Sequence, residues 1–325
     1  MVRRGRVAFW LFVGMVTTVG SLHGMVAGGY SALVSDGDGG WLALSDDKNH
    51  PRIYHLAIPL SRTDGGVAHV TGVTPLRDEM GEPLAEGTVD PEGLALLPPH
   101  ALLVSSEGFT KHGVPPRIWR ADRKTGRTLE RLPLPPDVIP DHKVSEEQTR
   151  GVLDNYGFEG LTLCPDGRTL LAATEAPLKQ DGPWPAAGGR GRVLVYDVKS
   201  APARLTGEHR YPLQAPSAGA WVHGLTAMLC LDDGRVLTLE RSWGRDVGFD
   251  ISLFLGRLPA KGPGLVEKKL LARINDLGVR MDNFEGLAPG PRLPDGRHTV
   301  LIISDDNFLP DQVSEVVWVA WRDPG

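Results

Sequence analysis

Phe158 to Glu175 reads FEGLTLCPDGRTLLAATE, and the layout of this stretch recurs along the chain. It has a short apolar segment, a turn containing Asp-Gly, and an apolar run that ends in an acid. An Asp-Gly turn between two apolar segments is typical of a β-hairpin. The other copies begin at Tyr30, Pro91, Val222 and Phe284. The sequence therefore predicts a series of equivalent hairpins.

Each hairpin contains a leucine at the same place, and successive leucines are 61 to 67 residues apart: Leu33, Leu94, Leu161, Leu225 and Leu287. A third strand-like run follows each hairpin, at residues 52–59, 117–121, 192–198, 251–258 and 316–321. A fourth usually follows, as at 128–133 or 203–212. Four-stranded units repeated radially form a β-propeller. We expect an all-β propeller with five or six four-stranded blades, and a two-sheet sandwich is the main alternative.

Two further expectations concern the ends of this pattern. The last unit stops after its third strand, so a strand from near the N-terminus is expected to complete it. Helical periodicity is weak throughout, and residues 145–153 are the best short candidate for a helix.

The N-terminal segment differs from the rest of the chain. Arg3, Arg4 and Arg6 precede an apolar run over residues 7–20, which is the pattern of an export signal. An uncleaved anchor is the alternative, because no clean small-residue cleavage site follows. We therefore divide the chain into residues 1–27, a signal peptide or anchor, and residues 28–325, the propeller domain. The mature protein is expected in the periplasm or outside the cell, with membrane contact only if the segment stays uncleaved.

Composition limits the possible partners. The chain has 325 residues and a net charge of −5, with 35 basic and 40 acidic side chains, so nucleic acid is not an expected partner. We expect a monomer that acts on a small molecule. The two cysteines, Cys164 and Cys230, precede the turns of adjacent hairpins with an offset of one position. This offset leads us to expect two free, buried thiols rather than a disulfide.

The acids of the repeat should gather at one mouth of the channel. In a propeller the first strand of each blade lines the channel and the second runs back beside it. The start of the first strand and the end of the second therefore meet at the same rim. First strands start with Glu92, Glu159, Glu285 and, in the fourth unit, His223. Second strands end with Asp46, Glu107, Glu175, Glu240 and Asp305, and Asp306 and Asn307 follow.

Close carboxylates repel one another unless something compensates their charge. Hard cations bound by oxygen ligands provide that compensation, and calcium suits this set better than zinc because thiols and imidazoles are scarce. The acids named above and Asn307 are the candidate calcium ligands. The plain alternative is that acids at strand ends only solvate loops or accept hydrogen bonds from backbone amides.

Several motifs resemble the phytase-like esterase family of β-propellers. They are GVLDNYGFEGLTLCPDGRTLLAATEAPL (151–178), DPEGLALLPPHALLVSSEG (90–108), PPRIWRADRKTGR (115–127), VLTLERS (236–242) and DNFEGLAPGPRLPDGRHTVLIISDDNF (282–308). The resemblance implies a propeller, usually exported, that is named by analogy with calcium-dependent phosphate-ester hydrolases. It also implies that the recurrent acidic positions are functional. His223 departs from the pattern, because the other units carry Glu there.

The leading functional hypothesis is a metal-dependent hydrolase of phosphate esters or other esters, a lactone included. The candidate catalytic residues are Glu159 and Glu285, Arg241 as a ligand for substrate phosphate, and His223. A serine esterase is less expected, since no G-x-S-x-G occurs and Ser31 reads as a buried strand residue. A propeller that binds a ligand or protein partner on the same face without catalysis is the alternative from another class.

Overall fold

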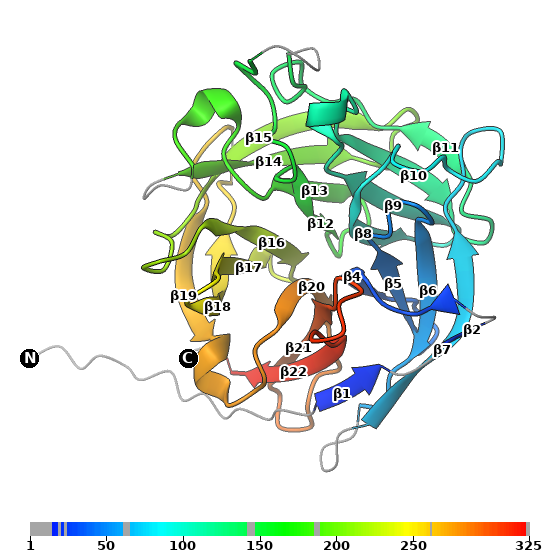
Figure 1. Ribbon diagram of the computed structural model, residues 1–325, viewed down its shortest axis with the longest axis vertical. Coiled ribbons are helices and arrows are strands. Elements are labelled where there is room, and N and C mark those ends of the chain that lie inside the picture. The colour runs from blue at the N-terminus through cyan, green and yellow to red at the C-terminus, as the bar shows by residue number, and fades with distance from the viewer. Residues whose placement is uncertain are drawn as a thin grey trace, which may run out of the picture.

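Five four-stranded blades surround a central channel in the computed structural model (Figure 1). The structure describes residues 15–18, 21–22, 25–60, 66–141, 147–184, 189–260 and 262–322, with side chains from residue 27 onward. Within these ranges the strands of each blade pair antiparallel, so the predicted all-β propeller is confirmed with five blades.

The blades have the following strands. Blade one contains β4 (Tyr30–Ser35), β5 (Trp41–Ser45), β6 (Arg52–Ala57) and β7 (Gly66–Pro75). Blade two contains β8 (Pro91–Leu97), β9 (Ala101–Ser106), β10 (Arg117–Asp122) and β11 (Thr128–Arg131). Blade three contains β12 (Phe158–Leu163), β13 (Thr169–Thr174), β14 (Arg190–Asp197) and β15 (Arg204–Pro212). Blade four contains β16 (Val222–Cys230), β17 (Arg235–Gly244), β18 (Gly248–Arg257) and β19 (Glu267–Arg273).

Blade five takes its fourth strand from the N-terminal side of the chain. It contains β20 (Asn283–Pro289), β21 (His298–Asp305) and β22 (Glu315–Trp321), and β22 pairs antiparallel with β1 (Met15–Thr18). β1 also pairs in parallel with β7, which joins blades five and one into one sheet. The expected N-terminal closing strand is confirmed. It lies inside residues 1–27, whose assignment as a signal peptide or anchor stays a prediction.

Short elements complete the description. β2 (Ser21–Leu22) pairs with β3 (Met25–Val26), and the described helices are the 3-10 turns η1 (Thr110–His112), η2 (Lys179–Asp181) and η3 (Ile274–Leu277). None of the described helices has the length and apolar character needed to cross a membrane. The helix expected at 145–153 is wrong for its described part, 147–153, which is irregular. There the Asp141 carboxylate accepts amide hydrogens from Thr149 and Arg150, which favours a turn.

The recurring leucines lie on the innermost strands, as the repeat predicts. Each is buried on its first strand, and these strands contact one another in the order β4, β8, β12, β16, β20 and back to β4. The apolar core is divided into clusters between neighbouring blades, so that Leu161 packs with Leu103 and Ile118 of blade two. Burial of these faces stabilises the ring, since each fully buried aliphatic side chain contributes about 1.5–3 kcal/mol.

A glycine precedes this leucine in four blades because the inner strands come very close together. A Cβ at Gly160 would lie 2.8 Å from a methyl carbon of Leu225 in the next blade, and one at Gly224 would lie 2.3 Å from Cγ of Glu175. Only a residue without a side chain fits such an approach. The glycine of the E-G-L motif is therefore explained by packing around a narrow channel.

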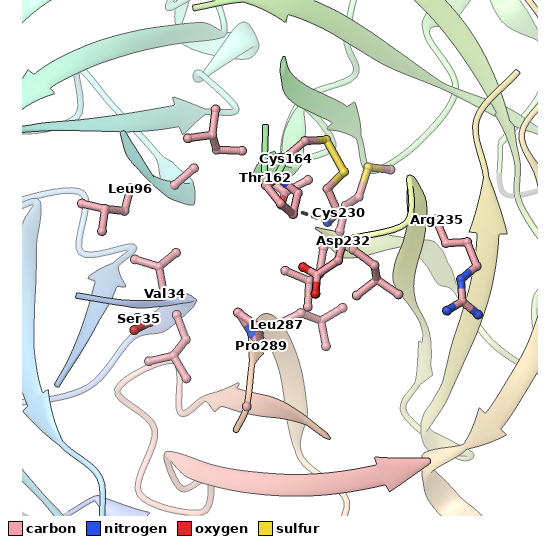
Figure 2. Close-up of a pocket in the computed structure, with 18 of the residues that line it drawn as sticks. Val34, Ser35, Leu96, Thr162, Cys164, Cys230, Asp232, Arg235, Leu287 and Pro289 are labelled. Atoms are coloured by element: carbon pink, nitrogen blue, oxygen red, sulfur yellow. Dashed lines mark hydrogen bonds between the residues drawn. A yellow bond between two sulfur atoms is a disulfide. The ribbon is translucent and has the colours of Figure 1, made fainter. Parts of the chain in front are cut away.

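Cys164 and Cys230 form a disulfide, so the expectation of two free thiols is wrong. Their Cα atoms are 5.0 Å apart, and the bridge lies in the wall of one mouth of the channel (Figure 2). The offset of one position does not separate them, because Cys230 is the last residue of β16 while Cys164 already lies in the turn after β12. The Cys230 amide also donates to Thr162 Oγ1 at 3.1 Å, which brings the two chain segments together.

Candidate functional site

β-Bulges set the first-strand glutamates at the mouth of the channel. Pairing with the second strand is interrupted between Pro91 and Leu94, between Phe158 and Gly160, and between Phe284 and Gly286. The interruptions contain Glu92, Glu159 and Glu285 respectively. A bulge re-aims the side chain of its extra residue, and all three glutamates line one cavity of about 710 Å³.

The second strands supply further acids at the same rim, of which Asp46, Glu107 and Asp305 line the cavity and Glu175 lies beside Glu107 and Glu159. Glu107 and Glu175 directly follow β9 and β13, Asp46 follows β5, and Asp305 is the last residue of β21. Glu107 is held by the Gly157 amide, which donates to its Oε1 at 2.6 Å. The predicted meeting of strand starts and strand ends at one rim is therefore observed for these acids.

Two overlapping groups of three carboxylates lie within metal-binding distance. Asp90, Glu92 and Glu107 form the first group, and Glu107, Glu159 and Glu175 form the second. In each group one oxygen per residue lies within 4.8 Å of the others, and all five residues are buried. Glu159 is 7% exposed, and its Oε2 has no hydrogen-bond partner among the described residues. Buried oxygens without thiol or imidazole ligands fit a hard cation such as calcium.

The carboxylates of this cluster are strained electrostatically. Burial, followed by repulsion from Glu159, raises the pKa of Glu92 well above its ordinary value. Burial and the charges of Glu285 and Asp90 raise the pKa of Asp46 to about 8. Burial raises the pKa of Glu175 to about 7, against the opposing effect of Arg241. Burial is the largest cause of each shift, and repulsion from neighbouring carboxylates adds to it for Glu92 and Asp46.

Arg241 provides the main internal compensation. Its guanidinium contacts Glu285 and Asn283 of blade five and donates to Glu175 Oε1 of blade three at 3.2 Å. Its side chain is 13% exposed. Lys48 is the second cation, and its Nζ lies 2.7 Å from Asp90 Oδ2. Arg241 was predicted to bind substrate phosphate, but in this structure its guanidinium is occupied by protein acceptors.

Residues of the 282–308 motif in blade five have two roles. Some line the cavity or order its acids, and Asp306 instead holds the start of blade one in place. Asn283 Nδ2 donates to Glu285 at 2.9 Å and to Asp305 at 3.3 Å, which orders these two acids. Asn307 lines the cavity in a left-handed conformation with φ of 47°. Asp306 instead accepts hydrogen bonds from the Gly29 amide and from Ser314, and so braces the entry to blade one.

Glu240 and His223 do not join the acids at the mouth. Glu240 pairs with Leu225 in the β16–β17 ladder, whereas Glu107, Glu175 and Asp305 lie three residues beyond the partner of the corresponding leucine. Glu240 and His223 line a separate cavity of about 270 Å³. The acid that ends an apolar run in the sequence thus has a different structural position in blade four.

Sequence reasoning missed Asp90 and Lys48. Asp90 belongs to the first carboxylate group, and it stands two residues before Glu92. Residues two apart on an extended chain share a face, so this spacing was a usable signal. Lys48 follows Asp46 and Asp47 in a loop, and nothing in the repeat marks it.

The opposite mouth of the channel has a different character. It opens into a cavity of about 560 Å³ lined mainly by apolar side chains, including Val34, Leu96 and Leu287 (Figure 2). The Cys164–Cys230 disulfide forms part of its wall. The buried acids and the apolar mouth therefore lie at opposite ends of the inner strands.

Fold and site together define a five-bladed β-propeller with a buried acidic mouth. The family described as "Phytase-like: Esterase-like activity of phytase" matches residues 26–308, so the chain belongs to this family and the resemblance seen in the sequence is confirmed. An uncharacterized secreted protein of Arthroderma benhamiae is 30% identical over 113 residues, which are 34% of this chain and 22% of that protein.

A solved structure shares the fold at low sequence identity. A hypothetical protein from Leishmania major has a TM-score of 0.50 and 12% identity, with 98% of this chain and 92% of that chain covered. An endo-arabinase from Bacteroides thetaiotaomicron has a TM-score of 0.48 and 13% identity, with 93% and 96% covered.

Proposed function

We propose that the protein is an exported, calcium-dependent hydrolase of phosphate esters or other esters that works at the acidic mouth. The observation that carries the proposal is the pair of buried carboxylate groups that share Glu107 and include the unpartnered Glu159 oxygen. Such a cluster is costly at neutral pH unless cations occupy it. Family membership adds the expectation of activity on esters.

The proposed ligands are the two carboxylate groups. Asp90, Glu92 and Glu107 would hold one cation, and Glu107, Glu159 and Glu175 a second. Bound calcium supplies positive charge that polarises an ester oxygen and makes a bound water more acidic. The acidic rim favours a small ester over a heavily phosphorylated one, because a polyanion would require a ring of Lys and Arg.

Other residues of the mouth position the reacting groups. Glu285 lies outside both carboxylate groups, and Asn283 and Arg241 fix its orientation. Burial raises the pKa of Glu285 despite the opposing charge of Arg241, which suits it as the group that accepts a proton from the attacking water. Tyr156 lines the cavity of the acidic mouth and packs against Trp184 with ring centroids 4.0 Å apart, so the Tyr156 ring is held where a substrate could contact it.

Export is supported by three observations. The sequence begins with the basic and apolar pattern of an export signal, and the related Arthroderma benhamiae protein is described as secreted. An oxidising compartment is also where a structural disulfide such as Cys164–Cys230 forms and persists.

Thermal melts with calcium and with a chelator test the metal site. We expect calcium to raise Tm through preferential binding to the native state, and Glu159→Gln or Glu107→Gln to abolish most of the increase. Glu86→Gln is the matched control, because Glu86 is exposed in the loop between β7 and β8. If calcium leaves Tm unchanged in the parent protein, the metal site is disproved.

Hydrolysis of p-nitrophenyl phosphate and of simple carboxylic esters and lactones tests the activity. We expect a calcium-dependent component of the rate, which the chelator removes and which Glu285→Gln lowers by roughly 10²–10⁴-fold. Calcium binding without hydrolysis of any of these esters would instead favour the non-catalytic binding propeller.

A further inference from the structure

A serine, a histidine and a glutamate meet in the separate cavity of blade four. Ser242 Oγ lies 2.8 Å from His223 Nδ1, and His223 Nε2 lies 3.2 Å from Glu240 Oε2. The three residues are 2–5% exposed. The imidazole thus lies between a hydroxyl, which bonds to Nδ1, and a carboxylate, which is within ion-pair distance of Nε2 without an aligned hydrogen bond. A nucleophile, a base and an orienting acid are arranged in this order.

Strand alternation separates this group from the acidic mouth. Glu240 and Ser242 of β17 line the separate cavity, whereas Arg241 and Trp243 line the acidic mouth. The neighbouring strand β16 shows the same alternation, because His223 lines the separate cavity while Val222 lines the acidic mouth. The two cavities therefore lie on opposite faces of the blade-four sheet.

The glutamate is fixed and kept ionised by its surroundings. Tyr211 donates to Glu240 Oε1 at 2.7 Å, the Gln214 amide donates to Oε2 at 3.0 Å, and Lys268 also contacts Oε1. Although burial opposes it, bonding to His223 and Lys268 holds the pKa of Glu240 below its ordinary value. A carboxylate that is charged at neutral pH can stabilise an imidazolium beside it.

The serine is reachable from the cavity and has an amide donor near it. The Ser217 N–H points at Ser242 Oγ across 3.3 Å. The loop that carries Ser217 also contains Gln214 and Ala215, which are exposed and line the cavity, so it opens to solvent there. When Ser242 attacks the ester carbonyl carbon, the carbonyl oxygen becomes negatively charged. An amide at this place can stabilise that charge by donating a hydrogen bond to the oxygen.

We propose that Ser242, His223 and Glu240 form a second, metal-independent hydrolytic site that acts on short-chain carboxylic esters. A cavity of about 270 Å³ admits a small acyl group, and Phe254 and Leu270 supply its apolar wall. Arg273 also lines this cavity, and its side chain is 48% exposed. The exposed end of the cavity can therefore hold a polar alcohol group as it leaves the ester.

The reaction follows from the contacts. Ser242 Oγ bonds to the ester carbonyl carbon while its proton passes to His223 Nδ1. The carbon–oxygen bond of the ester then breaks, and the alcohol leaves with the proton from His223. Water attacks the resulting acyl-serine and gives its proton to the same nitrogen, which returns it to Ser242 as the carboxylic acid departs. Ester and water are the only reactants.

Fluorophosphonate labelling of the intact, chelator-treated protein tests the nucleophile. We expect the reagent to modify Ser242, as located by mass spectrometry of the digested protein, and His223→Gln to lower the labelling rate roughly 100-fold or more. Ser200→Ala is the matched control, because that hydroxyl lies beyond β14, donates to the Asp197 carbonyl and does not line the cavity. Absence of label on Ser242 in the folded parent protein would overturn the proposal.

Hydrolysis of p-nitrophenyl acetate in excess chelator provides an independent measurement. Ser242→Ala should reduce this rate to the uncatalysed background while leaving the calcium-induced rise in Tm intact. Glu159→Gln should do the opposite, so failure of one site does not obscure the other. An unchanged rate in a folded Ser242→Ala variant would overturn the second site and leave the acidic mouth unaffected.

Discussion

The guanidinium of Arg241 joins carboxylates from two different blades. It contacts Glu285 of blade five and Glu175 of blade three. Removing one partner of a buried ionic group leaves the others uncompensated, which costs about 3–5 kcal/mol. We therefore expect Arg241→Met to lower the free energy of unfolding by roughly this amount in urea titrations with chelator present.

Calcium should recover part of the loss in Arg241→Met, because it replaces the missing positive charge. Arg257→Met is a suitable control, since Arg257 is exposed at the end of β18. An Arg241→Met variant as stable as the parent without calcium would show that the acids are neutral or far apart.

The pKa values of Asp46 and Glu175 predict how the metal-free protein responds to pH. Both are raised by burial, to about 8 and about 7, so the native state binds more protons than the unfolded state between about pH 4 and pH 8. The contribution of these protons to stability is complete at low pH and is lost as pH rises through the folded pKa values. With chelator present, Tm should fall from pH 5 to pH 8.

Asp46→Asn should make this decline shallower, because the amide has no proton to lose. Calcium should raise Tm most at the alkaline end, where cations no longer compete with protons for the carboxylates. A metal-free Tm that increases over this interval would contradict the assigned direction of both shifts.

At the scale of elements, the hairpin pattern predicted most of the acidic mouth. It placed Glu92, Glu159 and Glu285 at strand starts because the E-G-L motif recurs. It did not reveal the bulges that aim these side chains, since a bulge is a property of pairing between two strands. Glu240 was misplaced for the same reason, because its register with Leu225 depends on strand lengths that differ in blade four.

No local sequence motif could have predicted the serine–histidine–glutamate group. His223 and Ser242 become neighbours only through the cross-strand pairing of β16 with β17. Their separation in the sequence follows no nucleophile pattern, and the adjacent Arg241 belongs to the other site. Pairing register, rather than spacing along the chain, creates this arrangement.

The disulfide gives an element-scale prediction of stability. Cys164 and Cys230 connect blades three and four across 66 residues of sequence. A cross-link of that span constrains the unfolded chain by about 4 kcal/mol in the loop-entropy model. We expect the double Cys164→Ala, Cys230→Ala variant to melt at a lower temperature than the parent protein.

The oxidised protein should also show no thiol to Ellman's reagent after denaturation without reductant. Reduction of the parent protein should bring its Tm close to that of the double variant. Two reactive thiols in the unreduced, denatured protein would contradict the bridge.

At the scale of the whole molecule, the repeat decided the fold but left the number of blades open. Long loops allowed a sixth, degenerate blade, and only the ring contacts from β20 back to β4 exclude one among the described residues. The core also follows from the repeat, because every recurring leucine packs between neighbouring blades. Metal and substrate are not encoded by this geometry, since the same blades serve many functions.

The closing strand β1 links folding of the ring to the order in which the chain is synthesised. β1 is the first strand to be synthesised, and its antiparallel partner β22 is the last, so β1 must wait for the rest of the protein. Among the described strand pairs, β1 and β22 are the furthest apart in the sequence, and such contacts form late because loop closure costs entropy. A peptidase that removed residues 1–27 during export would also remove β1. Processing and closure by β1 are therefore alternative fates of the same segment, and the earlier event decides how the ring is finished.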